Sequence, residues 1–217
     1  MDKKPGATYV PGGSLQNSLR VIKWSLSKNK IDKRESKLTM VGCTGDDIHR
    51  EKILEALREV GVVDLLQVAK GEKTSRCAAG ILNKVRCLLT DIKASNSLTD
   101  DFITQHFDEI CSHDALLLEG YFIVKKFDLI KRVVNEFKLK NKPIIFTLSA
   151  VFCIKQFPNE MLEIANDAYV IFCNYEECVA LAGEEKQYYS DTIECCHRKL
   201  KPARRFLIVT CGKKGVI

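Results

Sequence analysis

The N-terminal part of the chain alternates between helical and extended hydrophobic patterns. Apolar residues recur with helical spacing over 18–27 and again over 49–62, so both segments are predicted to be amphipathic helices. Between them, 37–47 is predicted to be a short strand that ends in glycines. The segments 62–70 and 76–92 are rich in apolar and β-branched residues, which predicts two further strands.

From residue 97 onward the pattern becomes a regular alternation of helices and strands. The strand candidates are continuous apolar runs, as expected for strands that are buried on both faces. The predicted order is helix 98–112, strand 114–123, helix 127–140, strand 142–152, helix 159–167, strand 168–174, helix 175–183 and strand 204–212. This alternation predicts an α/β fold with a mainly parallel central sheet between helices, in three layers (α/β/α). The carboxyl ends of such strands meet at one edge, where ligands bind.

Length and composition fit a globular protein with one sizeable core. The 217 residues are 46% hydrophobic and 29% charged. No apolar run approaches the roughly 20 residues that a transmembrane helix needs, and the N-terminus lacks the apolar segment of a signal peptide. We therefore expect a protein of the cytoplasm, with the nucleus as an alternative compartment, and no membrane partner.

The chain contains ten cysteines, most of them inside apolar runs. In a protein of the cytoplasm they are expected to be reduced and buried as small hydrophobic side chains. Cys195, Cys196 and His197 form a possible metal-binding cluster, but no CxxC pair accompanies them. We therefore predict no cysteine-bound metal at this cluster.

The net charge of +6 is confined to residues 1–37, which hold nine basic and three acidic residues. A basic segment can attract nucleic acid, but 28–37 contains no aromatic residue that would stack on a base. This segment is predicted to be a solvated loop, and no nucleic-acid partner is expected. Asp46 and Asp47, which follow Gly45, are likewise predicted to form a solvated turn.

Two adjacent glycines, Gly12 and Gly13, precede the first predicted helix in the sequence PGGSLQNS. One interpretation is a turn followed by a helix that Ser14 or Asn17 caps. The other interpretation is that the backbone is left uncovered so that a polar ligand can lie against it. The segment by itself does not decide between them.

The residues that follow the predicted strands have the chemistry of a nucleotide site. Aromatic residues occur in 120–122 and 149–152, an amide and carboxylates in 173–177, and lysines between glycines in 210–215. Aromatic rings suit a planar base, an amide with a carboxylate suits Mg²⁺ bound through water, and a glycine-rich turn with lysine suits a phosphate. Neither a GxGxxG nor a Walker A motif occurs, which disfavours the common dinucleotide and P-loop sites.

Taken together, these segments resemble the adenosine kinases of the ribokinase-like (PfkB) carbohydrate kinase family. The likeness begins with GGSLQNSLRVIKW and continues in order through VGCTGDD, TSRCAAGILNKVRCLL, EGYF, LSAVF, the NxxE of NYEE and VTCG. It covers essentially the whole chain and implies one partial kinase domain over 1–217, with the strands of a small β lid within 62–93. It also implies that ATP, with Mg²⁺, phosphorylates the 5′-hydroxyl of adenosine to give AMP in purine salvage, and that the full-length protein is a monomer.

The resemblance implies a role for each matched residue. The implied substrate-binding residues are Gly12, Gly13 and Asn17 under the ribose, Cys77 and Leu88 on the lid, and Phe122 and Phe152 beside the adenine. The implied residues on the phosphate side are Asn174 and Glu177 for Mg²⁺ held through water, Asn174, Thr210 and Gly212 for ATP, and Arg86 of the lid for the transferred phosphate.

The resemblance is incomplete at both ends. The family's second signature, Asp-Thr-Asn-Gly-Ala-Gly-Asp, does not occur, nor does a first strand with the acidic residue that grips the ribose, and Val151 replaces a proline. Because that signature supplies the general base and the anion hole, the 217 residues by themselves are predicted to be inactive. Two alternatives stay open: a catalytically inactive nucleoside-binding or regulatory paralogue, and a kinase for another nucleoside or a sugar.

Overall fold

The structure is a computed structural model, which describes residues 8–28, 36–83, 85–200 and 206–217. The chain forms two compact units, an N-terminal unit (Met1–Phe102) and a C-terminal unit (Ile103–Ile217). Most of the predicted loop at 28–37 lies outside the described residues. Within the described residues, no helix is both long enough and apolar enough to cross a bilayer.

The core of the N-terminal unit is a pair of parallel strands packed against two helices. The elements are α1 (Ser14–Lys28), β1 (Leu38–Gly45), α2 (Ile48–Glu59) and β2 (Val62–Ala69). β1 and β2 pair in parallel, from Leu38 opposite Val62 to Gly45 opposite Ala69. Three of these elements, α1, α2 and β2, supply the buried cluster Leu19, Leu54, Leu57, Val62 and Leu66, and Leu38 and Met40 of β1 pack against it. Both amphipathic helices and both strands were predicted from the hydrophobic pattern and are confirmed.

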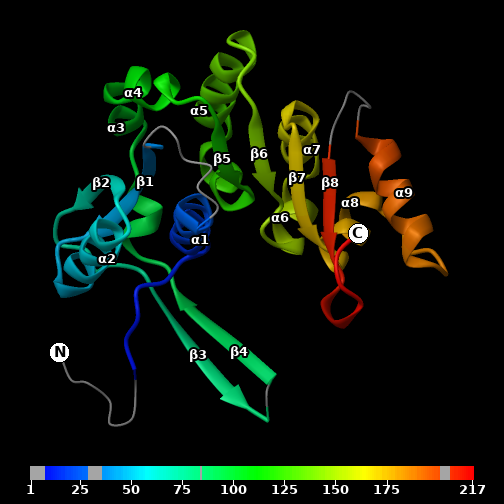
Figure 1. The fold of residues 1–217 in the computed structure, drawn as a ribbon, viewed down its shortest axis with the longest axis horizontal. Coiled ribbons are helices and arrows are strands. Elements are labelled where there is room, and N and C mark those ends of the chain that lie inside the picture. The colour runs from blue at the N-terminus through cyan, green and yellow to red at the C-terminus, as the bar shows by residue number, and fades with distance from the viewer. Residues whose placement is uncertain (1–7, 29–35, 84, 201–205) are drawn as a thin grey trace. The chain divides into compact units, whose positions relative to one another are not determined.

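A separate antiparallel hairpin, β3 (Arg76–Leu82) and β4 (Val85–Asp91), projects from these elements (Figure 1). Neither strand pairs with any third strand of the described chain. The side chains of β3 after Arg76 are exposed, including Ile81 and Leu82 at 75% each. The prediction of strand structure over 76–92 is therefore confirmed, but this hairpin has no packed face.

The turn that contains Asp47 is a structural joint rather than the solvated turn that was predicted. Asp47 caps α2, because its Oδ1 accepts hydrogen bonds from the backbone N–H groups of His49 (3.1 Å) and Arg50 (3.2 Å). The same carboxylate accepts from the hydroxyl of Thr74 at 2.7 Å and from the Thr74 N–H at 3.0 Å. Thr74 is only 3% exposed and lies two residues before β3. Asp47 therefore joins α2 to the start of the hairpin.

The C-terminal unit is built on four parallel strands in the order β5-β6-β7-β8. Its strands are β5 (Leu116–Glu119), β6 (Ile144–Thr147), β7 (Val170–Asn174) and β8 (Phe206–Thr210), side by side in Figure 1. Its helical segments are α4 (Phe107–Ser112), α5 (Gly120–Leu139), α6 (Val151–Gln156), α7 (Pro158–Asp167), α8 (Tyr175–Ala182), α9 (Tyr189–Lys199) and η2 (Gly212–Lys214). The segment η1 (Ala94–Ser97) precedes the boundary between the units, and α3 (Asp100–Gln105) spans it. The predicted α/β fold with mainly parallel strands is confirmed.

Several element boundaries differ from the predicted ones. The strands predicted over 114–123 and 142–152 end early, and helices begin at Gly120 and Val151. The helix predicted over 98–112 is broken at His106 into α3 and α4. β7 alternates in burial, with Ile171 fully buried and Phe172 40% exposed, so the expectation of burial on both faces is wrong for this strand.

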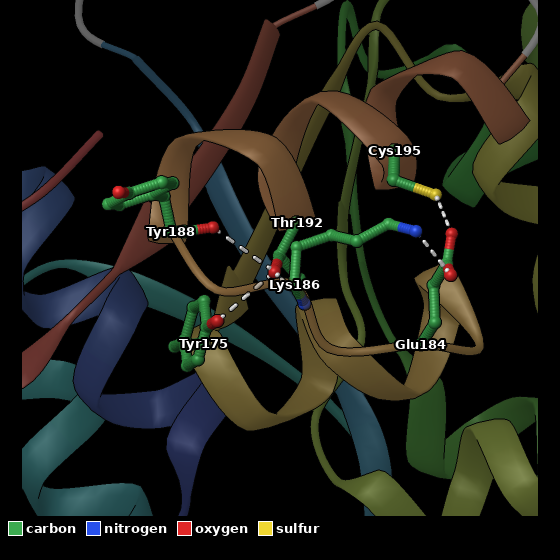
Figure 2. A network of polar contacts seen from close by, with 6 residues as sticks. All are labelled: Tyr175, Glu184, Lys186, Tyr188, Thr192 and Cys195. Atoms are coloured by element: carbon green, nitrogen blue, oxygen red, sulfur yellow. Dashed lines mark hydrogen bonds and ion pairs between the residues drawn. The ribbon is translucent and has the colours of Figure 1, made fainter.

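A buried hydroxyl joins α8 to α9 through the loop between them (Figure 2). The Thr192 side chain is 0% exposed and its Oγ1 accepts from the Tyr175 hydroxyl (3.2 Å) and from the Lys186 N–H (2.9 Å). The same hydroxyl donates to the carbonyl oxygen of Tyr188 at 3.4 Å. Nearby in the same loop, Glu184 accepts from the thiol of Cys195 and pairs with Lys186. The Thr192 hydroxyl therefore forms hydrogen bonds with the first residue of α8, with the loop and with Tyr188 at the start of α9.

The substitution Thr192→Val is expected to destabilise the protein by about 1–3 kcal/mol, because the Lys186 N–H and the Tyr175 hydroxyl lose their acceptor. Thr192→Ser keeps the hydroxyl and serves as the matched control. Urea denaturation followed by circular dichroism measures the difference. Equal unfolding free energies for the Val and Ser variants would contradict this role.

The stabilising effect of Asp47 is expected to disappear in acid. Partial burial raises the pKa of Asp47, but the hydrogen bonds from Thr74, Arg50 and His49 together hold the pKa below its ordinary value of 3.8. A carboxyl group with a lowered pKa stabilises the folded state above its unfolded pKa, and this contribution is lost as the pH falls through the folded pKa.

Thermal unfolding of the native chain and the Asp47→Asn variant tests this effect from pH 7 down to pH values below the ordinary pKa of the group. The native chain is expected to melt at the higher temperature near neutral pH, and the two melting temperatures should converge in acid. A gap that stays constant or widens as the pH falls would be inconsistent with the lowered pKa.

Candidate functional site

The carboxyl ends of the four parallel strands meet at one edge of the C-terminal unit. The register aligns Glu119 with Thr147 at the ends of β5 and β6, and Asn174 with Thr210 at the ends of β7 and β8. Each of the first three strands passes directly or within a few residues into a helix. The side chains that follow these strands therefore gather at this edge, as the sequence predicted.

The ends of β5 and β6 are locked together by a close backbone approach. The Gly120 N–H donates to Ser149 Oγ (2.9 Å), and Ser149 Oγ donates to the Thr147 carbonyl (3.2 Å). A Cβ at Gly120 would lie 2.5 Å from the carbonyl oxygen of Leu148, so a larger residue does not fit. Ser149 has a positive φ of 70°, a left-handed conformation that is uncommon for a serine. This contact explains why β5 ends at Glu119.

Two exposed aromatic rings stand above this contact. The Tyr121 hydroxyl donates to the Ser149 carbonyl at 3.1 Å, and the Tyr121 and Phe152 rings are 6.0 Å apart between centroids. The two residues are 45% and 46% exposed. Phe122, which the resemblance placed beside the adenine, is half-buried on α5. The ring that lies against Phe152 is therefore Tyr121, which sequence analysis did not single out.

Electrostatic effects connect these rings to the end of β7. Burial raises the pKa of the Tyr121 phenol, and the nearby Cys153, Glu119 and Glu177 raise it further. Burial also raises the pKa of the Cys153 thiol to about 11, with Glu177 adding to the rise. The Glu177 carboxylate therefore acts electrostatically on the Tyr121 phenol and on the Cys153 thiol.

Asn174 and Glu177 form a reciprocal cap at the start of α8. The Asn174 side chain accepts from the Glu177 N–H at 2.8 Å, while the Asn174 N–H donates to Glu177 Oε2 at 3.1 Å. The Asn174 amide also donates to Glu177 Oε1 at 2.8 Å. This arrangement is a capping box, which accounts for the NxxE spacing as a helix start.

The same two residues have the donor atoms of an indirect Mg²⁺ site. Glu177 is 6% exposed, and burial raises the pKa of its carboxyl group, although the Asn174 N–H opposes this rise. A cation nearby would stabilise a carboxylate in this position, and each of its oxygens keeps a further lone pair. Within the described residues, no group of three or more His, Cys, Asp or Glu side chains is placed to hold a metal ion. Water and phosphate oxygens would have to complete the coordination at Asn174 and Glu177.

The turn after β8 completes this edge. Thr210 donates to the Cys173 carbonyl at 3.4 Å, and Gly212 has a φ of 57° in the tight turn that returns to Val216. The Lys214 ammonium lies 3.7 Å from the centroid of the Tyr189 ring, which stacks on Tyr175 at 3.9 Å. Helix α9 therefore holds the lysine-containing turn beside the start of α8. The hydrophobic pattern did not predict α9, so this contact was not predicted either.

In the N-terminal unit, the two glycines lead directly into α1. Gly13 has a φ of 109°, which side-chain-bearing residues rarely adopt, and nothing lies within 4 Å of a Cβ placed there. Gly12 and Asn17 are also exposed, and the Asn17 N–H closes the first turn on the Gly13 carbonyl at 3.1 Å. The backbone before α1 is therefore open to a ligand, as the second interpretation of this segment requires.

Gln16 is an unexpected feature of the same helical turn. It is 0% exposed, and within the described chain neither its Nε2 nor its Oε1 has a hydrogen-bond partner. A buried amide without a partner is costly, so this position is under an unusual constraint. The only sequence signal was a polar residue on the same helical face as Leu19.

The predicted lid residues lie on the hairpin. Cys77 pairs with Thr90 and Ala79 pairs with Leu88, so Cys77 and Leu88 share one face of the two strands. Both are exposed, Leu88 at 51%. Arg86 pairs with Ile81 in the backbone register, and its side chain lies outside the described part of the chain. The ribose and lid residues thus belong to the N-terminal unit, and the aromatic, Asn174, Glu177, Thr210 and Gly212 positions belong to the C-terminal unit.

The chain is similar to curated relatives in sequence and to solved structures in fold. The chain is 27% identical to the adenosine kinase of Saccharomyces cerevisiae over 217 residues, covering 98% of this chain and 62% of the relative. It is 29% identical to the adenosine kinase of Dictyostelium discoideum over 216 residues, covering 96% and 62%. The chain thus spans about 62% of the length of these relatives.

The structural comparison agrees. A crystal structure of Anopheles gambiae adenosine kinase in complex with P1,P4-di(adenosine-5) tetraphosphate matches with a TM-score of 0.82 at 24% identity, covering 95% of this chain and 65% of that one. A ribokinase from Giardia lamblia matches with a TM-score of 0.72 at 16% identity, covering 100% and 66%. These matches confirm the ribokinase-like fold class. The model of the "pfkB family carbohydrate kinase" matches residues 1–217, and the chain therefore belongs to the pfkB family of carbohydrate kinases.

Proposed function

We propose that this chain carries the nucleoside-binding part of an adenosine kinase, an enzyme that transfers a phosphoryl group from ATP to the 5′-hydroxyl of adenosine. The observation that carries the proposal is the exposed Tyr121–Phe152 pair at the carboxyl edge of the sheet, with the Glu177 carboxylate nearby. Exposed aromatic rings suit the stacking of a planar base, whereas a bare sugar would suit a polar surface. The two curated relatives, both adenosine kinases, support adenosine as the nucleoside.

In this proposal the open backbone before α1 receives the ribose. Gly12 and Gly13 allow close approach, and the Asn17 amide can donate to one hydroxyl and accept from another. Cys77 and Leu88 offer an exposed surface on one face of the hairpin that would cover the nucleoside. These roles follow from the exposure of the residues and from their match to the family.

The phosphate side of the proposed site lies at the ends of β7 and β8. Asn174 and Glu177 would hold Mg²⁺ through water, and the ion would neutralise phosphate charge as it develops during transfer. Thr210 and Gly212 would border ATP, and Arg86 would supply a fixed positive charge for the transferred phosphate. The partners in this proposal are small molecules only.

Calorimetric titration of the 217-residue chain with adenosine tests the proposal. The Phe152→Ala variant is expected to weaken adenosine binding by about 5-fold to 150-fold, because stacking of a base on an aromatic side chain is worth roughly 1–3 kcal/mol. Phe206→Ala is the matched control, since Phe206 is 56% exposed and begins β8 at the opposite end of the sheet. An unchanged affinity in Phe152→Ala, or no binding by the native chain, would contradict the proposal.

Turnover by the same 217 residues is expected to be undetectable. The sequence contains no Asp-Thr-Asn-Gly-Ala-Gly-Asp segment, and the loss of a general base alone costs about 10²-fold to 10⁴-fold in rate. Incubation of the chain with adenosine, ATP and Mg²⁺, followed by chromatography, measures AMP directly. AMP above the level of a protein-free control would show that another residue of this chain serves as the base.

A further inference from the structure

The orientation of the β3–β4 hairpin must be set at its two ends, where it joins the rest of the N-terminal unit. A two-stranded hairpin without a packed face is only marginally stable in water. β3 and β4 pair only with each other in the described chain, and most of their described side chains are exposed. We call 72–75 the first root and 93–97 the second root of the hairpin.

The first root is held by the end of β1 and the cap of α2. The Gly45 N–H donates to the Thr74 hydroxyl oxygen at 3.1 Å, and the Asp46 N–H donates to the Glu72 carbonyl at 3.3 Å. The Thr74 hydroxyl in turn donates to Asp47 Oδ1, and the Thr74 N–H donates to Asp47 Oδ2. Thr74 therefore uses its N–H and both functions of its hydroxyl on this joint. Hydrogen bonds to a carboxylate are stronger than neutral ones, so Asp47 is the central group.

Backbone packing reinforces this root. A Cβ at Gly45 would lie 2.3 Å from the carbonyl oxygen of Glu72 and 2.5 Å from the Thr74 nitrogen. Only a glycine allows the chain at 72–74 to pass so close to the end of β1. The first root therefore packs against the end of β1 and also forms hydrogen bonds with it.

The second root is hydrogen-bonded to the first root and also packs against β1 and β2. The Ala94 N–H donates to the Lys73 carbonyl at 3.2 Å, and the N–H groups of Lys93 and Ser95 donate to the Ser75 hydroxyl oxygen at 3.0 and 3.1 Å. The contact between Asp47 and Thr74 therefore lies at the first root, to which the second root is bonded.

We propose that Asp47 and Thr74 form a latch that holds the β3–β4 hairpin in the orientation needed to cover a bound nucleoside. Both are positioning residues, because neither is one of the residues that would touch the nucleoside. The inference rests on the proposed function for its consequence, which is nucleoside affinity, and on the hydrogen bonds of Asp47 and Thr74 for the latch itself. A hairpin that adopts its competent orientation only a tenth of the time would bind about tenfold more weakly.

Two substitutions open the latch with little effect on the surrounding structure. In Asp47→Asn, the retained oxygen still accepts from His49, Arg50 and the Thr74 hydroxyl, so α2 stays capped, but the new NH₂ group faces the Thr74 N–H and removes that hydrogen bond. Thr74→Val keeps the shape of the side chain and removes the hydroxyl. Thr74→Ser keeps the hydroxyl and is the conservative variant that should restore native behaviour.

Hydrogen exchange of the apo chain measures the latch directly. The amides of Thr74, Lys93, Ala94 and Ser95 are expected to exchange at least about tenfold faster in Asp47→Asn and Thr74→Val than in the native chain and in Thr74→Ser. Amides of β1 and β2 other than Gly45, whose N–H is bonded to the Thr74 hydroxyl, should keep their native rates. Native exchange at both roots in Asp47→Asn and Thr74→Val would overturn the latch.

Titration with adenosine and, separately, with ATP measures the consequence. Adenosine should bind about tenfold more weakly to Asp47→Asn and Thr74→Val, while ATP affinity, assigned to the ends of β7 and β8, should not change. Equal weakening of both ligands would indicate general destabilisation and overturn the positioning role. If the native chain binds no adenosine, the proposed function fails, and the exchange rates decide the latch by themselves.

Discussion

The parallel pairing of β5 to β8 is the constraint on which the candidate site depends. Parallel neighbours cannot be joined by tight hairpins, so the chain returns through helical segments to the same end of the sheet before each new strand. All four strands consequently finish at one edge, where Glu119 aligns with Thr147 and Asn174 aligns with Thr210. The passage from strand to helix is sharpest at Gly120, where only a hydrogen atom fits against the Leu148 carbonyl. The positions of Tyr121 and Phe152 follow from that turn.

The N-terminal unit differs, because the hydrophobic side chains of its hairpin, such as Ile81, Leu82 and Leu89, are exposed and do not pack against a core. The joint to the hairpin uses polar contacts in place of apolar burial. A single carboxylate, Asp47, caps a helix and accepts both hydrogen bonds from Thr74. Partly buried, charge-assisted hydrogen bonds have the directionality that apolar contacts lack. Such a joint can fix the direction of a hairpin while leaving its faces exposed for a ligand.

The hydrophobic pattern predicted most elements correctly because their apolar spacing matches the burial that the fold imposes. It failed where one apolar run passes from strand to helix. Tyr121, Phe122 and Ile123 continue the run of β5, so nothing in their hydrophobicity marks the turn at Gly120. Helix α9 was missed because its buried face consists of Thr192 and Cys196, which are not strongly apolar.

Only part of the candidate site could be predicted from the sequence. Residue type and position after a strand indicated the segments 149–152, 173–177 and 210–215, and the family resemblance then singled out Phe152, Asn174, Glu177 and Thr210, which do stand at the carboxyl edge. The role of Asp47 depends on Thr74, which is 27 residues away, and the role of Tyr121 depends on Ser149, which is 28 residues away. Contacts over such separations are set by the fold, and a local pattern does not contain them.

The central claim is that this chain binds a nucleoside with the aromatic pair on the carboxyl edge of the C-terminal unit. Mapping of backbone amide chemical shifts on addition of adenosine tests it most directly. The account predicts that shifts in this unit are concentrated at the segments that follow β5 and β6. Shifts confined to other surfaces, or no shifts at millimolar adenosine, would contradict it.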